Sequence, residues 1–340
     1  MESYGHSLAV VAGSPSRQQG LRGDAVSAFR WLNTRKTRVL TFRGHSVRHV
    51  GARQIWKNAD AVVVELASGS LDAHVASIAH ARRPLLVWGH VSNYVDRGNL
   101  LDRWLETRLM RRSDIVFAYT QGGKRAAVER GIPAQRVVAL TNTVDTEAEV
   151  AGLESVAGAS TEVGDSTLPT FAYIGGLDED KRVDFLADVL DELWTCAPHI
   201  RFEVGGRGAD EWRLRAAAER GQVTLHGHVG IDQKIRIAAK SWALVNPGRV
   251  GLIAVESFAL RLPLITTDFP FHAPEFEYLA PGEDSLVVPG SAAEFARALA
   301  ELSADPSRVN ALRAAAAAKA DQFTMEAMVQ RFVGGILSVL

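Results

Sequence analysis

Short apolar runs alternate with amphipathic segments along almost the whole chain, and this alternation predicts strands and helices in turn. In the first half, the runs predicted as strands are residues 7–12, 38–42, 61–65, 84–88, 115–119 and 136–140. In the second half they are residues 170–174, 201–205, 222–226, 243–245 and 263–267. The predicted helices are residues 49–57, 70–82, 100–112, 123–130, 183–195, 210–220, 233–239, 252–260, 292–302, 306–321 and 324–340. Strands that alternate with helices in this way form parallel sheets covered on both faces.

The helix predicted at residues 100–112 has an apolar and a basic face. Four apolar side chains at helical spacing are expected in the core, namely Leu101, Trp104, Leu105 and Leu109. The basic face is formed by four arginines, Arg103, Arg108, Arg111 and Arg112. An ordinary solvated face explains these arginines, and the sharper interpretation is a surface that docks on anionic membrane lipids.

The length of the chain predicts two domains. Its 340 residues exceed the ~250 to 300 residues at which a single core usually stops growing. Residues 146–169 are rich in Glu, Ser, Ala and Gly, which is typical of a linker. We therefore expect a Rossmann-like domain over residues 1–145, a second over 170–322, and a C-terminal helix, 323–340, that returns toward the first. Two doubly wound α/β domains facing a cleft are the simplest arrangement, with ligands at the carboxyl ends of the strands.

Composition and charge exclude several classes of protein. With 38 basic and 39 acidic residues, the net charge of -1 gives no general attraction for nucleic acid. The single cysteine, Cys196, cannot form an intramolecular disulfide and fits a reducing compartment. No apolar run approaches the ~18 to 20 residues of a spanning helix, and no basic region precedes the first apolar run as in a signal peptide. The sequence therefore predicts a cytoplasmic protein.

Residues 243–268 combine a strand, a glycine turn and a helix, and they are the strongest local signal for a ligand site. Gly248 and Gly251 lie in the turn, and the helix is predicted to begin at Leu252 and Ile253. Glycines allow the backbone to approach a ligand, and the free N–H groups of a first helical turn can bind phosphate. Glu256 lies one turn into the helix, where it can accept hydrogen bonds from sugar hydroxyls. By spacing alone it could equally be a solvated helix residue.

The other metal and phosphate motifs are incomplete. Residues 178–180 form an Asp-Glu-Asp run that is more typical of a solvated turn than of a metal-binding DxD. Residues 206–211 lack the third glycine of a dinucleotide fingerprint, and residues 122–125 lack the hydroxyl of a P-loop. Four histidines lack metal-ligand spacing, namely His45, His49, His226 and His228. We therefore expect no metal site and no cofactor.

Several motifs in order resemble the retaining, nucleotide-sugar-dependent glycosyltransferases of family 4, which have two Rossmann-like domains in the GT-B fold. In the first half the matching motifs are YGHSLAVVAGSP at 4–15, PLLVWGHV at 84–91, and RRSDIVFAYTQGGKRAAVERGIPAQRVVALTNTVDT at 111–146. In the second half they are YIGGLDEDKRVDFL from 173, FEVGGRG from 202, VTLHGHV from 223, the stretch 243–268, and HAPEFEYLAPGEDSLVVP from 272. Each motif alone is weak, and their common order gives the resemblance its weight.

The resemblance implies a donor site in the second half. Lys181 matches the lysine that contacts the donor diphosphate, a role suited to a compact ammonium charge. Glu256 matches the second glutamate of the family's E-x7-E motif, which holds the ribose. The backbone amides of Leu252 and Ile253 would bind the diphosphate and the sugar.

Three further residues carry implied roles. Val229 and Lys234 correspond to the segment that frames the nucleobase. His90, after a predicted strand in the first half, matches a histidine that contacts the transferred sugar and the reaction centre. A plain loop or core histidine is the alternative interpretation of His90.

The chain departs from the family pattern in three places. Gly248 stands where the first glutamate of E-x7-E is expected, which we interpret as a subfamily variant. Gly176 stands where family members have an arginine beside the lysine, so one phosphate contact is lost. Only four residues precede Gly5, so the first strand and glycine loop of the family are expected to be missing.

Together, the residues and the resemblance predict a metal-independent, hexosyltransferase-type glycosyltransferase. It would move a sugar from a UDP- or GDP-sugar to a hydroxyl of a glycan or lipid-linked acceptor with retention, in polysaccharide or glycolipid assembly. No side chain is a convincing nucleophile, which fits deprotonation of the acceptor by the leaving phosphate. Two alternatives stay open: an impaired member that binds a nucleotide or a partner protein, and a nucleotide-sugar epimerase of the same fold.

Overall fold

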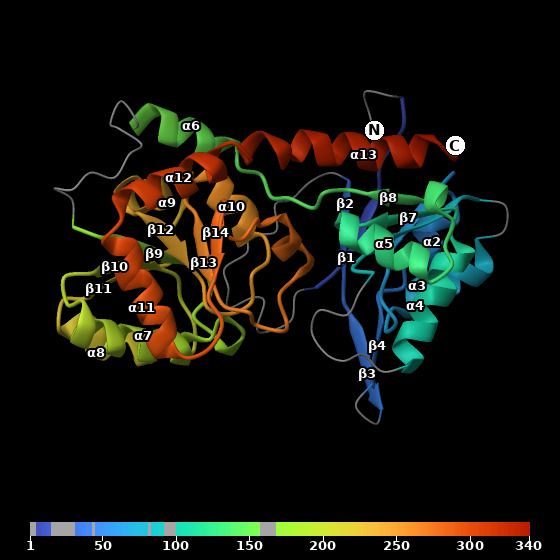
Figure 1. The fold of residues 1–340 in the computed structure, drawn as a ribbon. Helices are drawn as coiled ribbons and strands as arrows, with labels where there is room; N and C mark the ends of the chain where they lie inside the picture. The colour runs from blue at the N-terminus through green and yellow to red at the C-terminus, as the bar shows by residue number, and fades with distance from the viewer. Residues whose placement is uncertain (1–4, 15–30, 43–44, 81–82, 92–99, 157–167) are drawn as a thin grey trace. The chain divides into compact units, whose positions relative to one another are not determined.

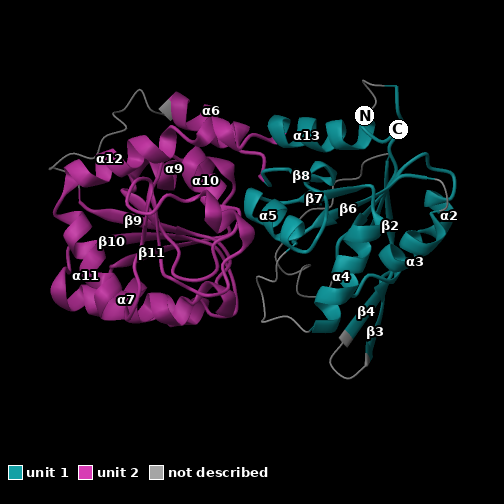
Figure 2. Ribbon diagram, turned by 45° about the vertical axis from the view of Figure 1, so that its right-hand side comes forward, with its two compact units in different colours: residues 1–142, 326–340 teal, residues 143–325 magenta. Residues whose placement is uncertain are grey.

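The computed structural model describes residues 5–14, 31–42, 45–80, 83–91, 100–156 and 168–340. The chain divides into two compact units (Figure 2). Unit 1 comprises residues 1–142 and 326–340, and unit 2 comprises residues 143–325. Both units contain a parallel sheet, as the sequence predicts for an α/β fold. The prediction of two Rossmann-like domains is confirmed.

Unit 2 is built on a six-stranded parallel sheet in the order β11-β10-β9-β12-β13-β14 (Figure 1). Its strands are β9 (Thr170–Ile174), β10 (Arg201–Gly205), β11 (Val223–Gly227), β12 (Ala243–Val245), β13 (Leu264–Thr266) and β14 (Ser285–Val287). Numbered from the first strand of the unit, this is the order 3-2-1-4-5-6 of doubly wound nucleotide-binding folds. The order reverses between β9 and β12, and ligands bind at such a switch point.

The helices of unit 2 cover both faces of this sheet. They are α6 (Glu147–Val156), α7 (Val183–Cys196), α8 (Arg215–Glu219), α9 (Ile231–Lys240), α10 (Ile253–Ala259), α11 (Ala292–Ser303) and α12 (Pro306–Ala317). Alternate residues of β9 point to opposite faces: Phe171 joins the core formed with α7 and α11, and Ala172 joins the core formed with α9 and α10. Burying one side chain as large as Phe171 contributes about 1.5 to 3 kcal/mol. The central strands β9, β12 and β13 therefore consist mostly of apolar residues, whereas β10 and β11 also contain charged and polar ones.

Unit 1 contains a four-stranded parallel sheet in the order β5-β6-β7-β8. These strands are β5 (Val62–Glu65), β6 (Leu85–Gly89), β7 (Ile115–Ala118) and β8 (Val137–Ala139). The helices of the unit are α2 (Arg53–Trp56), α3 (Leu71–Ala79), α4 (Leu100–Arg112), α5 (Gln121–Glu129) and α13 (Met325–Leu337). A separate parallel pair is formed by β1 (Val10–Gly13) and β2 (Leu32–Arg35), and an antiparallel hairpin by β3 (Arg38–Phe42) and β4 (His45–His49).

The hairpin corrects one prediction, because residues 49–57 were expected to be one helix. Strand β4 extends to His49, and only Arg53–Trp56 is helical. Residues 45–49 contain one apolar residue, Val47, and β2 and β14 were also missed. Strands β2 and β4 are mostly polar and β14 has three residues, so none of them shows the longer apolar run of a buried strand.

Helix α4 corrects a second prediction. Leu109 is fully buried as expected, but Leu101 is 50% exposed and Trp104 is 58% exposed. Glu106 is buried instead, where its carboxylate meets Arg130 at 3.6 Å. Helical spacing does not reveal this buried ion pair, because Arg130 lies at the C-terminal end of another helix, α5.

The segment predicted as a linker contains helix α6, so this part of the domain prediction is corrected. Gly152 of α6 approaches α9 so closely that a Cβ atom there would lie 2.1 Å from Ile235 Cδ1. The small residues that suggested a linker therefore serve close helix packing. Residues 157–167 lie outside the described part of the chain.

Helix α13 packs in unit 1. The Phe332 ring lies 4.6 Å from the Phe117 ring and 5.4 Å from the Trp88 ring, measured between centroids. Ile336 is buried in the same cluster. At Gly335, an added Cβ would lie 2.4 Å from Phe117 Cε1, so the helix approaches β7 closely because a glycine faces it. The C-terminal segment thus completes the core of the N-terminal unit.

Candidate functional site

The switch point of the unit 2 sheet lies between the carboxyl ends of β9 and β12. The loop after β9 contains Gly176 and ends in a short 3-10 turn at Glu179–Lys181. The loop after β12 contains Gly248 and Gly251 and leads into α10. Four of the predicted site residues, Lys181, Gly248, Gly251 and Glu256, therefore come together at one end of the sheet.

Two hydrogen bonds join these loops directly. The Lys181 ammonium donates to the Arg249 carbonyl at 2.6 Å, and the Arg249 N–H donates to the Asp180 carbonyl at 2.8 Å. A Cβ atom on Gly248 would lie 2.4 Å from the Lys181 carbonyl carbon and 2.5 Å from the Asp180 oxygen. No side chain fits there unless the backbone moves. The glycine at the position of the missing glutamate is therefore required by the packing of the two loops.

The electrostatics of the switch point are set by two cations, Lys181 and Arg249. Burial lowers the pKa of Lys181 below its usual value; Asp178 opposes this shift, and the charge of Arg249 adds to it. An anion bound here would restore the pKa by favouring the ammonium form. Arg249 was not predicted, and it brings a guanidinium near the lysine in a chain that has Gly176 where an arginine was expected.

The backbone amides of Leu252 and Ile253 lie at the start of α10. The hydrogen bonds of this turn begin with the N–H groups of Ala254, Val255 and Glu256, which donate to the Gly251 and Leu252 carbonyls. Among the hydrogen bonds of the described residues, none is donated by the N–H groups of Leu252 and Ile253. First-turn N–H groups without an intrahelical partner are available to a ligand.

Glu256 belongs to a buried chain of charges. Its carboxylate accepts from Lys234 of α9 at 2.6 Å, and Lys234 lies 3.6 Å from Glu149 of α6. Burial alone would lower the pKa of Lys234, but the two carboxylates outweigh it and raise the pKa above the usual value. A carboxylate has about four acceptor positions, so Glu256 can meet a sugar hydroxyl while Lys234 holds it. Glu149 was missed because it lies in the segment predicted as a linker.

Val229 lies in the loop between β11 and α9, and its side chain is 7% exposed. It packs against Gly205, where an added Cβ would lie 2.8 Å from Val229 Cγ2. The side chain of Val229 is therefore core, and a ligand beside this loop would meet mainly its backbone. Lys234 follows on α9, so the two residues predicted to frame a base share one loop and helix.

His272 is a further residue of this end of the sheet whose role the sequence did not indicate. Its Nδ1 accepts from the Val250 N–H at 3.0 Å, and its Nε2 lies 2.9 Å from the Thr267 carbonyl. Burial lowers the pKa of His272, so the ring is neutral and carries its proton on Nε2, which donates to Thr267. It positions the loop after β12. Its signal in the sequence is weak because one of its two partners, Val250, lies in a different loop.

His90 lies in unit 1, directly after β6. It is exposed, and its ring centroid lies 4.4 Å from that of Tyr119, which follows the neighbouring strand β7. His90 and Tyr119 thus mark the carboxyl edge of the unit 1 sheet. Among the described residues, no group of three or more His, Cys, Asp or Glu side chains could hold a metal ion.

The comparisons with known proteins agree in both units. Residues 1–148 match the family model described as Glycosyltransferase Family 4, and residues 168–305 match that described as Glycosyl transferases group 1. No curated protein matches the sequence.

Solved structures resemble the chain at low sequence identity. Anabaena Alr3699/HepE in complex with UDP and glucose has a TM-score of 0.61 and 16% identity, covering 91% of this chain and 86% of that one. The pneumococcal O-GlcNAc transferase GtfA in complex with UDP and GlcNAc gives 0.61 and 17%, covering 89% and 64%. The apo lipopolysaccharide outer core galactosyltransferase WaaB gives 0.58 and 16%, covering 84% and 78%.

The fold is that of the GT-B glycosyltransferases. The family matches in the two halves and the likeness in fold together support a nucleotide-sugar glycosyltransferase. In the part of the chain that the structure describes, no helix is both long enough and apolar enough to cross a membrane.

Proposed function

We propose that the protein transfers a hexose from a UDP- or GDP-sugar to a hydroxyl of a glycan or lipid-linked acceptor, with retention at the anomeric carbon. The observation that carries the proposal is the meeting of Lys181, Arg249 and the first-turn amides of α10 at the switch point of the unit 2 sheet. Similar folds have been solved with UDP and sugars, which favours UDP over GDP.

Each residue has a role in this proposal. Lys181, Arg249 and the amides of Leu252 and Ile253 stabilise the negative charge that develops on the leaving diphosphate. Glu256, held by Lys234, accepts hydrogen bonds from the ribose. His90 of unit 1 contacts the transferred sugar. The leaving phosphate takes the proton of the acceptor hydroxyl, and no metal or other cofactor takes part.

Calorimetric titration with UDP, GDP and ADP tests the donor site. One nucleotide should bind at micromolar strength, and Lys181→Ala and Glu256→Ala should each weaken it about tenfold or more, a loss of ~1.4 kcal/mol. Matched controls are Lys240→Ala, whose lysine pairs with Glu203 away from the switch point, and Glu301→Ala on α11. Equal losses in the controls, or no binding of any nucleotide, would reject the donor site.

Two other functions make different predictions. An impaired family member would bind the nucleotide but leave a UDP-sugar intact in the presence of every acceptor offered. An epimerase would convert the donor sugar without any acceptor. Separation of the sugar products after incubation with and without acceptor distinguishes the three functions.

The setting in polysaccharide or glycolipid assembly at the inner face of a membrane is part of the same proposal. Helix α4 favours it, because Leu101 and Trp104 are exposed beside Arg108, whose guanidinium lies 5.9 Å from the Trp104 ring. Exposed aromatic and basic side chains together bind anionic lipid surfaces. Sedimentation with phosphatidylglycerol vesicles, but not with phosphatidylcholine vesicles, is expected and should decrease in Trp104→Ser.

A further inference from the structure

Unit 1 contains a basic cavity that the donor site does not use. It has a volume of about 410 Å³ and is lined by Arg35, Lys36, Arg38, His49, Val50 and Gly51. Three of these six residues are cations and none is acidic. The two neighbours in the lining, Val50 and Gly51, are uncharged. Such a cavity attracts an anion with several oxygens.

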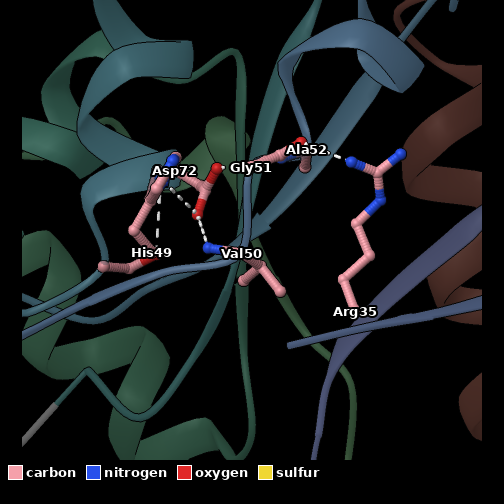
Figure 3. A network of polar contacts seen from close by, with 8 residues as sticks. Arg35, His49, Val50, Gly51, Ala52 and Asp72 are labelled. Atoms are coloured by element: carbon pink, nitrogen blue, oxygen red, sulfur yellow. Dashed lines mark hydrogen bonds and ion pairs between the residues drawn. The ribbon is translucent and has the colours of Figure 1, made fainter. Parts of the chain in front are cut away.

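A network of polar contacts holds the wall of the cavity in place (Figure 3). The Arg35 guanidinium donates to the Gly51 carbonyl at 3.0 Å. The Asp72 carboxylate accepts from the N–H groups of Val50 at 2.7 Å and Ala52 at 3.1 Å, and lies 3.2 Å from His49 Nδ1. The Asp72 carboxylate therefore fixes residues 49–52. None of these contacts uses the three cations of the lining.

The Asp72 carboxylate stays charged in this arrangement. Burial alone would raise its pKa, but the hydrogen bonds from Val50 and Ala52 and the neighbouring His49 outweigh burial and lower it. Because Asp72 contacts His49 through Nδ1, the Nε2 atom of His49 is left for another partner on the far side of the ring. The wall is therefore organised before any ligand binds.

The residue that holds the cavity wall lies at the carboxyl edge of the four-stranded sheet of unit 1. Asp72 is in the first turn of α3, which follows the carboxyl end of β5. His90 follows the carboxyl end of β6, the parallel neighbour of β5. Ligands of open α/β sheets bind at the carboxyl ends of the strands. Asp72, which fixes the cavity wall, and His90 therefore belong to the same edge of this sheet.

We propose that the cavity formed by Arg35, Lys36, Arg38 and His49 binds a phosphate or diphosphate group of the acceptor, so that the acceptor is a phosphate-linked molecule. The assignment of this anion to the acceptor rests on the proposed function, whereas the binding of the anion itself does not. Guanidinium groups bind phosphate oxygens through paired hydrogen bonds, and a diphosphate offers enough oxygens to engage several cations at once.

Binding of inorganic pyrophosphate to the full chain tests the proposal. The titration is made in the Lys181→Ala background and in saturating UDP, because pyrophosphate could otherwise occupy the donor site. One equivalent should bind, and Lys36→Gln/Arg38→Gln should weaken it at least tenfold; both side chains are exposed, so the fold should survive. Arg35→Gln, which also loses its bond to Gly51, should give a loss of similar size.

The control is Arg108→Gln/Arg111→Gln, which removes the same charge from the same unit. It should change pyrophosphate affinity less than threefold. An equal loss in the control, or no binding to the unsubstituted cavity, would overturn the proposal, because the attraction would then be the general charge of unit 1. The UDP titration of the unsubstituted protein is a separate test. If UDP does not bind but pyrophosphate does, the donor site is rejected and the proposed anion site in the cavity is supported.

A second arm identifies the source of the phosphate. Geranyl diphosphate that binds at least tenfold more tightly than pyrophosphate, and is equally sensitive to Lys36→Gln/Arg38→Gln, indicates a lipid-linked acceptor. Equal affinity of the two probes indicates a phosphate carried by a soluble glycan. Tight binding of geranyl diphosphate that is unchanged by Lys36→Gln/Arg38→Gln would contradict the proposed anion site.

Discussion

The two units carry opposite charge, although the chain as a whole is almost neutral. Unit 1 has 22 basic and 11 acidic residues, a net charge of +11, and unit 2 has 16 basic and 28 acidic residues, a net charge of -12. The acidic unit nevertheless holds the candidate site for an anionic nucleotide. Two cations of unit 2, Lys181 and Arg249, are gathered at the switch point, whereas the described arginines of unit 1 lie on several elements, among them β2, β3 and α4.

The difference separates two ways of attracting an anion. Fixed cations and backbone amides in a partly buried site act at close range, where screening is weak. Surface cations act over about one Debye length, ~8 Å at physiological ionic strength. The donor site should therefore be sensitive to single substitutions and nearly insensitive to salt, while anion binding by unit 1 should weaken steeply as salt is added.

The strongest test of this comparison is substitution of Gly248 and Gly176, the two glycines that stand where the family pattern has charged residues. Gly248→Glu restores the family glutamate but collides with the backbone at Asp180 and Lys181, so UDP affinity should fall about a hundredfold or more. Gly176→Arg restores the family arginine, and its nearest neighbour is the flexible Asp178 carboxylate at 2.8 Å, so UDP should bind as well or better. Calorimetry measures both. Normal UDP binding by Gly248→Glu would show that the loops do not meet as described.

Arg249 should matter more than the other arginines of unit 2. Arg249→Gln removes the guanidinium near Lys181, so kcat/KM for the UDP-sugar should fall roughly ten- to a hundredfold, ~1.4 to 2.7 kcal/mol. The exposed Arg213, which pairs with Asp210, provides the control Arg213→Gln. Steady-state kinetics at two salt concentrations would decide the matter, since comparable losses in both variants would mean that only the overall charge of unit 2 counts.

His90 tests the division of labour between the units. His90→Ala should lower kcat about tenfold, ~1.4 kcal/mol, because the proposed contact to the transferred sugar would be lost. The UDP dissociation constant should stay within twofold, since the proposed nucleotide contacts all belong to unit 2. Parallel kinetics and UDP titration measure the two effects. A weakened UDP affinity without loss of kcat would contradict the role of His90.

Much of unit 2 could be predicted from the sequence, because apolar strands and amphipathic helices are local signals. Its strands are short runs such as residues 170–174, which are mostly buried, and the glycine turn at 248–251 was recognised in advance. Contacts made by distant segments were not predictable. Arg249 stands beside Lys181 because two loops meet, and Glu149 reaches Lys234 because Gly152 lets α6 pack on α9.

Unit 1 was less predictable for a different physical reason. The β3 strand of its antiparallel hairpin was predicted, but the partner strand β4 has a single apolar residue, Val47, so no apolar run marks it. The total charge of the chain gives no sign of the basic cavity, because the acidic excess of unit 2 cancels the basic excess of unit 1. With 22 of the 38 basic residues in unit 1, counting by domain would have indicated anion binding there.

The pH dependence of UDP binding should sharpen the description of the donor site. The pKa of Lys181 is lowered, so the ammonium form is lost at a pH below the ordinary lysine value of about 10.4. In the proposed site UDP binds the charged form of this lysine, so its affinity should decline as the pH rises through the alkaline range. Protons should be taken up on binding there. Lys181→Ala should remove most of this decline, and an unchanged pH profile in that variant would assign the titration to another group.

The smallest expected effect on UDP affinity comes from the acidic residues of unit 2. It tests whether one of them contributes to the donor site. Glu149 is 3% exposed and faces Lys234, whereas Glu147 lies on the same helix and is exposed. Glu149→Gln keeps the shape of the side chain but leaves Lys234 with Glu256 as its remaining carboxylate. The ammonium should then hold Glu256 more tightly and leave it a poorer acceptor for the ribose, so UDP affinity should fall about threefold, ~0.7 kcal/mol. Glu147→Gln, the matched loss of charge, should leave UDP affinity unchanged. If both substitutions had the same effect, the acidic excess of unit 2 would act only through its total charge; a difference between them would show that one buried carboxylate tunes the donor site from a helix whose sequence is typical of a linker.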